Sequence, residues 1–315
     1  MCTMKSKNIF KFTISPDPSL RLDQLISQEL PEYSRSRIKN WIKDKRILIN
    51  GQTCLPKDKV KELSIVEVEL DTDDEIDIIS ENIPINVIYE DSDIIIVNKD
   101  SCMVTHTAPG NYSGTLQNAL LHHFPDLKKL PRAGIIHRLD KQTSGMLIIC
   151  KNLISQFQLS KDLQDRKIKK KYTAIVSGSL NKNQIIEKPI GRHPINRKKM
   201  TVISNGKYAK TIIDSYTNGE LGSVLNLEIV TGRTHQIRVH LSDIGHPVIG
   251  DYLYGFKKSA IKKNPELNEL MGNFEGIALH AYHLEFHHPT NKKDFAIECL
   301  PGDTFNGIRS LVLEK

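Results

Sequence analysis

The sequence lacks long apolar runs, so we expect neither a membrane-spanning helix nor a cleavable leader. No run of 18 apolar residues occurs in its 315 residues, and a spanning helix needs about that length. The first 19 residues hold only short apolar bursts, not the continuous apolar core of a signal peptide. We therefore expect a cytoplasmic protein without a membrane partner.

Cysteine is scarce and dispersed. The five cysteines form no CxxC pair, which favours reduced thiols over a disulfide framework. Cys150 lies in the apolar run MLIIC, so we expect it to be buried as a small hydrophobic residue. None of the 12 histidines falls into HExxH or a Cys/His ligand spacing, and no P-loop or GxGxxG follows a strand pattern. These absences argue against a metal site and a nucleotide cofactor.

The composition that remains is that of an ordinary globular protein. Hydrophobic residues make up 39% and charged residues 26%, close to average usage. No internal repeat and no low-complexity tract occurs. This excludes a mainly disordered chain, a collagen-like chain and a coiled-coil rod. The length fits two domains of about 150 residues each.

Charge is distributed unevenly along the chain. Residues 1–61 carry a net charge of +7, residues 62–93 carry −12 without a basic group, and residues 94–315 carry +12. Two basic bodies joined by an acidic stretch favour a polyanionic partner that contacts both. The alternative is that charge serves solubility alone, because a total of +7 is small for this length.

Residues 16–72 are predicted to form a small α/β module. Ser34 can cap a helix whose apolar face carries Ile38, Trp41 and Ile42. The run ILIN ends in an Asn-Gly turn, which is typical of a hairpin. The run SIVEVEL alternates apolar and charged residues, as a half-buried strand does.

The same helix presents Arg35, Arg37 and Lys39. These cations could bind phosphates, although a basic helix is more often simply a solvated surface. Residues 73–86 are acidic, lack aromatic side chains and contain Pro84, so we predict a linker there.

From residue 87 to the C-terminus, short strand-like runs alternate with helical patterns. The strand-like runs include NVIYEDSDIIIVNK, GMLIICK, YTAIVSG and VLNLEIV, and the helical patterns include LQNALLHHF and NLISQFQLSKDLQD. Such a mixture indicates a mixed α/β or α+β domain.

A polar loop between two strand-like runs is the first candidate for chemistry. It reads HRLDKQTSG at residues 137–145 and holds Asp140 close to the cations of Arg138 and Lys141. An ionised, well-placed carboxylate can act as a nucleophile or a base. An ordinary turn aspartate that bonds its own backbone has the same pattern.

Two further segments carry candidate functional groups. In TGRTHQIRVH, Thr234 can cap a helix. Arg238 then lies near the N-terminal end of that helix, where the helix dipole makes a positive charge unfavourable. In KIKKKYTAIV, Lys169 and Lys170 precede Tyr172, which could stack on a base or accept a proton. A surface salt bridge for the arginine and half-buried packing for the tyrosine are the plain alternatives.

Together these segments resemble known families. RLDQ, SRSRIK and the ING turn, in that order, resemble the S4 RNA-binding module. IIHRLDKQTSG, KKYTAIV and TGRTHQIRVHL, in this order and spacing, resemble the RluA-type family of RNA pseudouridine synthases. With the S4-like start included, the similarity covers the whole chain. It implies the α+β pseudouridine synthase fold over residues 87–315, with a mixed, mostly antiparallel sheet and an active cleft across it.

The resemblance also implies roles for single residues. Asp140 would be the essential catalytic residue, Tyr172 the active-site tyrosine, and Arg238 the basic residue that pairs with the aspartate. Arg138 would take the place of a flipped-out nucleotide base. His106 lies in a segment that departs from the family pattern, and we expect it to be a structural loop histidine. The remaining RNA-binding groups are expected at Arg35, Arg37, Lys39, Lys169 and Lys170.

The implied reaction is consistent with a single carboxylate. Converting uridine to pseudouridine breaks the N1–C1′ bond, turns the base and forms a C5–C1′ bond, without a redox step or a group donor. No cofactor is implied, whereas a hydrolytic glycosidase needs two carboxylates. The uridine must be flipped out of its stem or loop to react.

The expected substrate is a set of uridines in large-subunit (23S) ribosomal RNA, free or in a pre-50S particle, and the expected enzyme is a monomer. A related synthase acting on tRNA or on another rRNA loop would share every catalytic residue. An RNA-binding ribosome assembly factor would share the S4-like module and the charge pattern.

Overall fold

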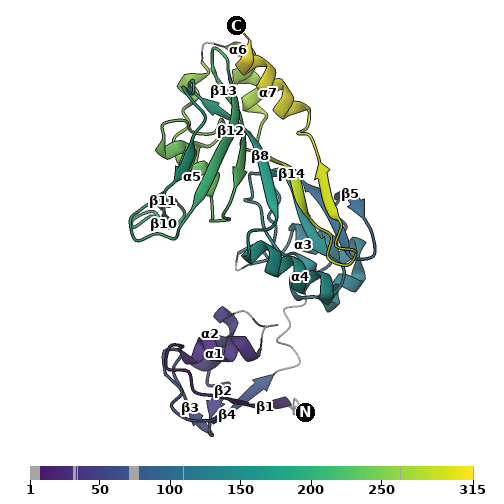
Figure 1. Cartoon of the computed structure of the whole chain (residues 1–315), viewed down its shortest axis with the longest axis vertical. Coiled ribbons are helices and arrows are strands. Elements are labelled where there is room, and N and C mark those ends of the chain that lie inside the picture. Colours follow the sequence, from purple (N-terminus) through teal and green to yellow (C-terminus); the bar gives the residue numbers. More distant parts are fainter. Residues whose placement is uncertain are drawn as a thin grey trace, which may run out of the picture. The chain divides into compact units, whose positions relative to one another are not determined.

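The computed structural model describes residues 8–30, 33, 35–70, 78–108, 110–262 and 264–314. The chain divides into two compact units, and the boundary lies between Ile78 and Ile79 (Figure 1). This division lies within the predicted linker at 73–86, whose residues 73–77 fall outside the described residues, as does Ser34, the predicted helix cap. Across the described ranges, no helix is both long and apolar enough to cross a bilayer.

The N-terminal unit is a four-stranded antiparallel sheet with two helices. The strand order is β1-β4-β2-β3. Asn50 and Gly51 have φ values of 49° and 75°, as the predicted Asn-Gly hairpin turn requires. The elements are β1 (Asn8–Ile14), α1 (Leu22–Glu29), α2 (Arg35–Lys43), β2 (Ile47–Ile49), β3 (Gln52–Thr53) and β4 (Ser64–Leu70).

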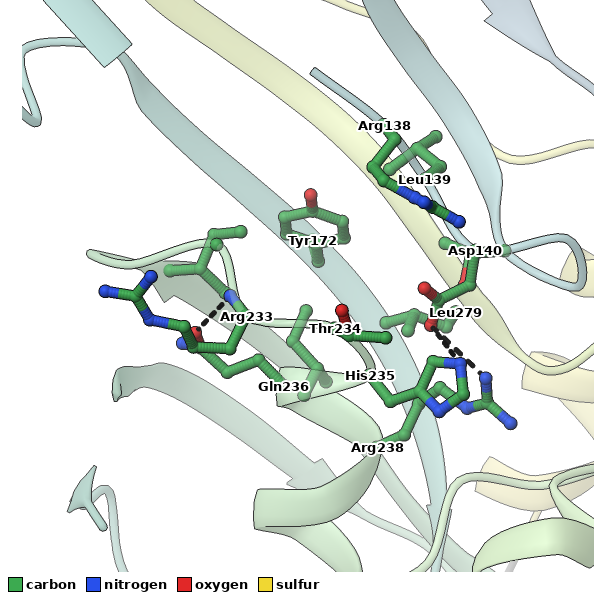
Figure 2. A pocket seen from close by; sticks show the side chains of 14 residues that line it. Arg138, Leu139, Asp140, Tyr172, Arg233, Thr234, His235, Gln236, Arg238 and Leu279 are labelled. Carbon is green, nitrogen blue, oxygen red and sulfur yellow. Dashed lines mark hydrogen bonds and ion pairs between the residues drawn. The ribbon is translucent and has the colours of Figure 1, made fainter. Parts of the chain in front are cut away.

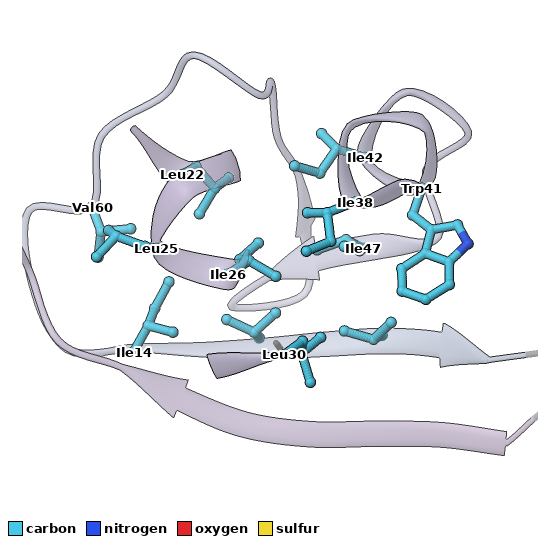
Figure 3. Packing of buried hydrophobic residues seen from close by; sticks show 12 residues of the cluster. Ile14, Leu22, Leu25, Ile26, Leu30, Ile38, Trp41, Ile42, Ile47 and Val60 are labelled. Carbon is cyan, nitrogen blue, oxygen red and sulfur yellow. The ribbon is translucent and has the colours of Figure 1, made fainter. Parts of the chain in front are cut away.

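Apolar side chains of both helices pack onto the sheet in the N-terminal unit (Figure 3). Ile38, Trp41 and Ile42 are 0%, 3% and 2% exposed, which confirms the apolar face predicted for α2. They join Ile26 of α1 and Val66 of β4 in one core. Each such side chain contributes about 1.5–3 kcal/mol on burial, so this small unit has a hydrophobic core of its own.

A buried carboxylate joins the two helices of this unit. Asp23, in the first turn of α1, is fully buried. It pairs with Arg21 at 3.1 Å, and with Arg35 and Lys39 of α2 at 2.8 and 3.5 Å. Burial raises the pKa of Asp23, but the hydrogen bond and charges of these cations outweigh it and lower that pKa. One acid therefore holds three cations on one face.

The C-terminal unit is built on a nine-stranded sheet. Its main order is β5-β6-β7-β14-β8-β13-β12-β9, and β15 pairs with β14. Among the described strands, β7 and β14 run parallel and the other neighbours run antiparallel, which confirms the mixed, mostly antiparallel sheet. The strands are β5 (Asn86–Glu90), β6 (Ile94–Lys99), β7 (Ser144–Cys150), β8 (Lys169–Ser177), β9 (Ile185–Glu187), β12 (Lys210–Asn218), β13 (Gly222–Ile229), β14 (Leu279–His287) and β15 (Asp294–Glu298).

Helices and a small hairpin complete this unit. The hairpin of β10 and β11 lies beside α5, and its apolar side chains pack with those of α5 (Figure 1). Near the C-terminus, α7 packs against α6 and β13. These elements are α3 (Leu116–His123), α4 (Leu153–Gln164), β10 (Ile190–Arg192), β11 (Met200–Val202), α5 (Gln236–Asp243), α6 (Pro265–Gly272) and α7 (Asp303–Leu313).

The centre of the sheet brings distant segments together. In the order β7-β14-β8-β13, the HRLD segment precedes β7, Tyr172 lies on β8, and α5 follows β13. The parallel contact between β7 and β14 depends on Gly145, which has a φ of 118°. A Cβ atom there would lie 2.4 Å from the backbone of Ala281, so only glycine lets the two strands approach this closely.

The prediction of a strand directly before the HRLD segment is wrong. Residues Pro131–Gly134 form a 3-10 turn, and Ile135 makes only an isolated bridge to Ile149 of β7. Arg132 and Ala133 have left-handed backbone conformations, which a strand cannot contain. The run after the loop does form a strand, and Cys150 at its end is fully buried as predicted.

The predicted cap of α5 is also wrong. The N-cap residue is His235, with a left-handed φ of 56°, and not Thr234. The side chain of Gln236 accepts hydrogen bonds from the Thr231 hydroxyl at 2.6 Å and the Arg233 N–H at 3.1 Å. These two hydrogen bonds to Gln236 take the place of the predicted cap by the Thr234 hydroxyl at the start of α5.

The Asp23→Asn substitution is expected to lower the stability of the N-terminal unit by about 1–3 kcal/mol, because the cations lose their shared buried acceptor. A lowered folded-state pKa means that Asp23 stabilises the fold above its unfolded pKa of about 3.9 and loses this effect as pH falls through the folded-state value. The difference between the variant and wild type should therefore shrink in acid. Trp41 is the single tryptophan, so its fluorescence during urea unfolding reports this unit.

The matched control for this measurement is Asp44→Asn, which removes the same charge from an exposed position of the same unit. We expect its midpoint to stay within the small range typical of surface substitutions. Equal shifts for the two variants would contradict a stabilising role for the Asp23 network.

Candidate active site

A pocket opens in the C-terminal unit between the HRLD segment, β8 and the start of α5 (Figure 2). Four of the residues predicted from the sequence line it: Arg138, Asp140, Tyr172 and Arg238. They come from three segments of the chain that the central strands bring together. All four of these residues contribute to this one pocket.

Asp140 faces the pocket from a loop that is held firmly. Its side chain is 17% exposed, so solvent or a ligand can reach the carboxylate. Lys99 is 2% exposed, and its ammonium donates to the carbonyl of Lys141 at 3.4 Å and to those of Asp100 and Met103. Burial lowers the pKa of Lys99 to about 8. A cation and its backbone bonds therefore secure the chain directly after Asp140.

The guanidinium of Arg238 donates hydrogen bonds to two carboxylates. Its Nε and Nη2 donate to the two carboxylate oxygens of Asp251 at 2.7 and 3.0 Å, and its Nη1 donates to Asp140 at 3.2 Å. Arg238 is 3% exposed and Asp251 1% exposed. Burial alone would lower the pKa of Arg238, but the two carboxylates raise it. This explains why a cation lies in the first turn of α5, where the helix dipole disfavours it.

His235 lines the pocket beside this ion pair. Its Nδ1 is 2.7 Å from the Tyr254 hydroxyl, and its Nε2 is 3.9 Å from Asp140. The Tyr254 oxygen also accepts the Met200 N–H at 2.8 Å, so this hydroxyl is held in place beside His235. Burial lowers the pKa of His235. The imidazole of His235 therefore lies between the Tyr254 hydroxyl and Asp140, and burial disfavours its charged form.

Tyr172 forms another wall of the pocket. It is 6% exposed and is held on β8 between Leu227 of β13 and Ala281 of β14. Burial, and then the negative charge of Asp140, raise the pKa of Tyr172. The phenol therefore keeps its proton at neutral pH, with a flat apolar ring facing the space next to the carboxylate (Figure 2).

The basic residues predicted on β8 differ in their surroundings. Lys169 is exposed and pairs with Glu285 at 2.7 Å. Lys170 is half-buried, and burial lowers its pKa to about 8. Neither lines the pocket itself. Arg138 lines it and is exposed to solvent.

The predicted basic residues of α2 lie in the N-terminal unit. Arg35 and Lys39 are held by Asp23. Arg37 is placed differently, with its guanidinium over the rings of Tyr33 and Trp41 at 5.3 and 5.2 Å. Stacking of this kind favours a structural contribution from Arg37.

Asp251 and His235 were missed in the sequence as site residues, although His235 lies in TGRTHQIRVH, a segment noted for its functional groups. Lys99 was missed too, and its signal was a lysine at the end of the apolar run IIIVNK. The pairing of Asp251 with Arg238 has no sequence signal, because it depends on how the chain folds back after α5.

One cluster in the described part of the chain has the composition of a metal site. Asp91, Asp93 and His288 place ligand atoms within 4.8 Å of one another. Asp91 accepts the N–H groups of Asp93 and Ile94 and a hydrogen bond from Tyr89. These hydrogen bonds explain why Asp91 lies in this cluster: it stabilises the turn between β5 and β6. The cluster therefore needs no metal ion to account for it.

Asp251→Asn is expected to destabilise the C-terminal unit by about 2–4 kcal/mol, because the buried guanidinium of Arg238 loses its bidentate acceptor. Thermal unfolding followed by far-ultraviolet circular dichroism measures this loss. Asp243→Asn is the control, because Asp243 makes a partly exposed ion pair with Lys188 whose removal should cost under about 1 kcal/mol. A loss no larger than that of the control would mean that the buried pair adds no stability.

The family models match both units. A model described as RNA pseudouridylate synthase matches residues 93–243, and a model of the S4 domain matches residues 20–64. Among solved structures, human RNA pseudouridylate synthase domain containing 1 is similar, with a TM-score of 0.53 and 26% identity over 71% of this chain and 85% of that chain.

Curated relatives are similar over most of their length. Ribosomal large subunit pseudouridine synthase D of Haemophilus influenzae is 43% identical over 85% of this chain and 84% of its own. The protein of the same name from Escherichia coli strain K12 is 41% identical over 85% and 83%. An RNA pseudouridine synthase of Aquifex aeolicus is 41% identical over 99% of both chains. The chain therefore belongs to the RNA pseudouridine synthase family.

Proposed function

We propose that this chain converts specific uridines of large-subunit ribosomal RNA into pseudouridine, with Asp140 as the catalytic carboxylate. The observation that carries the proposal is the pairing of Asp140 with the buried Arg238 at 3.2 Å, at a pocket that opens to solvent. The ribosomal target is supported by relatives whose names give it and whose similarity extends over 83% or more of their length.

Each lining residue has a role in this proposal. Arg238 keeps Asp140 ionised and directs one carboxylate oxygen into the pocket, through a charge-assisted hydrogen bond. The ring of Tyr172 stacks on the uracil, and its neutral hydroxyl is available as base departure and re-attachment proceed. Asp140 then acts on the nucleoside at the moment when the N1–C1′ bond breaks.

Access to the pocket requires that the uridine leaves its helix or loop. Extruding a nucleotide costs a few kcal/mol, and Arg138 can offset part of that cost. Its guanidinium is exposed at the pocket and makes no ion pair among the described residues. A flat, weakly hydrated cation of this kind can stack where the base was.

A second contact with RNA is proposed on the N-terminal unit. A groove there is lined by Arg21, Lys39, Lys43 and Lys57 around the exposed Leu55. Cations around an apolar floor can bind both the phosphates and the bases of a strand. Action on a pre-50S particle, and as a monomer in the cytoplasm, stays a prediction.

Asp140→Asn should abolish pseudouridine formation, because the amide carries no negative charge and is a poor nucleophile. Mass spectrometry of ribosomal and transfer RNA from cells that carry only this variant measures the outcome. Modified uridines should be missing at the same positions as in cells that lack the chain. Unchanged ribosomal RNA in both strains, with a loss in transfer RNA, would identify the other class of substrate.

A growth assay separates catalysis from an assembly role. If the Asp140→Asn chain restores growth to cells that lack the protein without restoring pseudouridine, the chain contributes to ribosome assembly through binding alone. The variant should retain RNA affinity, since it removes one negative charge from a site that binds a polyanion.

RNA affinity is expected to fall severalfold between pH 7 and pH 9 at constant salt. The pKa of Lys170 is lowered to about 8, so this lysine is charged below that pH and neutral above it. Lys170→Arg stays charged and should flatten the profile in a fluorescence anisotropy titration. Lys169→Arg is the control, since the pKa of Lys169 is raised by Glu285. A profile unaltered by Lys170→Arg would exclude Lys170 as the titrating contact.

A further inference from the structure

His235 lines the active pocket but takes no part in the reaction as proposed. Its Nδ1 lies 2.7 Å from the Tyr254 hydroxyl, and the two rings meet edge to face with their centroids 5.5 Å apart. The side chain is 19% exposed, so a ligand in the pocket can reach it. Figure 2 shows the imidazole directly beside the carboxylate of Asp140. One side of the ring is therefore fixed by the protein, and the other side is open to a substrate.

The backbone of His235 is held in a conformation that favours glycine. Its φ is 56° and its ψ 22°, in the left-handed region. The carbonyl of His235 accepts the Val239 N–H at 2.9 Å, and the side chain of the next residue, Gln236, is bonded to Thr231. These contacts keep the residue in place although a side chain there costs free energy. Such a cost at the wall of a pocket indicates that the side chain itself contributes to function.

A gap separates Nε2 of His235 from the carboxylate of Asp140. The two atoms are 3.9 Å apart, whereas an N–H···O hydrogen bond spans about 2.7–3.2 Å. Within the described residues, Nε2 makes no hydrogen bond. Burial disfavours the charged imidazole, so the two groups are not drawn together as an ion pair. One oxygen atom about 2.8 Å from each of them would bridge the gap.

The chemistry of the two groups restricts what this oxygen can be. An ionised carboxylate only accepts hydrogen bonds, so the bridging group must donate to Asp140 and accept from an N–H at Nε2. In a nucleotide inside an RNA chain, the uracil carbonyls and the phosphate oxygens only accept, and the uracil N3–H only donates. The 3′ and 5′ oxygens of its ribose are esterified. The 2′-hydroxyl is therefore the group of the nucleotide that both donates and accepts.

We infer that the 2′-hydroxyl of the extruded uridine lies between His235 and Asp140, so that His235 selects a ribonucleotide over a deoxyribonucleotide at the reacting position. The hydroxyl donates to the carboxylate and accepts from Nε2. This contact uses the imidazole with its proton on Nε2, to which the Tyr254 hydroxyl donates at Nδ1. C2′ is bonded to C1′, the carbon whose bond to N1 breaks, so the contact also places the reacting sugar beside Asp140. The inference deepens the proposed function, on which it rests for the identity of the substrate as RNA.

The test compares two RNA substrates on two proteins. The probe is an RNA stem-loop in which the wild-type chain forms pseudouridine, with tritium at C5 of the target uracil, because this hydrogen is released after C5 joins C1′. A second copy carries 2′-deoxyuridine at the target position alone. His235→Asn removes the Nε2 atom and keeps a residue that tolerates the left-handed backbone. The ratio of kcat/KM for the ribose substrate to that for the deoxyribose substrate should be about fivefold larger for wild type than for His235→Asn, as expected for one hydrogen bond.

This ratio separates a contact with the substrate from a structural role of His235. Each ratio compares two substrates on one protein, so a lower folded fraction of the variant cancels. The different intrinsic reactivity of the deoxynucleoside is common to both proteins and cancels between them. His235→Gln is the conservative variant, because its side-chain amide N–H can reach the position of Nε2, and it should recover part of the ratio. A purely structural His235 would lower both rates equally in every variant and leave the ratio at its wild-type value.

Two controls locate the contact at one residue and one hydroxyl. Thr234→Ala changes the exposed neighbour of His235, which also lines the pocket, and its ratio should equal that of wild type. A stem-loop with the deoxynucleotide one position 3′ of the target should give the same ratio for wild type and His235→Asn.

The outcomes distinguish the inference from the function on which it rests. Equal ratios for wild type and His235→Asn at the target position overturn the inference, and so does an equal fall of the ratio in Thr234→Ala. If the wild-type chain releases no tritium from any ribosomal RNA stem-loop, the proposed function is rejected together with the inference.

Discussion

The guanidinium of Arg238 is the group on which the rest of the site depends. It is almost fully buried, and such a cation is costly unless its donors are satisfied. Asp251 satisfies two of its nitrogens in a fork, which leaves Nη1 directed at Asp140. The orientation of the partly exposed Asp140 is thus set by Asp251, which is buried and out of reach of a ligand. An exposed pair of the same residues would be mobile and screened by salt.

The sheet makes this arrangement possible by placing four strands in an order unrelated to the sequence. β14, near the end of the chain, lies between β7 and β8. It brings the HRLD loop and Tyr172 to opposite sides of one strand. The close parallel contact requires a glycine at position 145, which explains in physical terms why the loop ends in Ser-Gly. The geometry of the candidate site therefore depends on contacts made late in the chain.

Local patterns in the sequence predicted the elements well and their junctions less well. Some elements depend mainly on residues that are close together in the sequence, so their patterns could be recognised from the sequence. They are the apolar face of α2, the Asn-Gly turn and the alternating strand β4. The cap of α5 depended on Gln236 reaching back to Thr231, and the turn at Pro131–Gly134 depended on packing against β7. Asp140, Tyr172 and Arg238 were found through resemblance. Asp251 was not assigned, because its pairing with Arg238 has no signature in spacing.

The two units use the same electrostatic arrangement. In each, a carboxylate has almost no exposure: Asp23 holds Arg35 and Lys39 of another helix, and Asp251 holds Arg238. A protein that binds a polyanion must gather like charges, and these repel one another before the ligand arrives. A buried acid relieves that repulsion from within, and it does so without presenting a negative charge at the surface that RNA approaches.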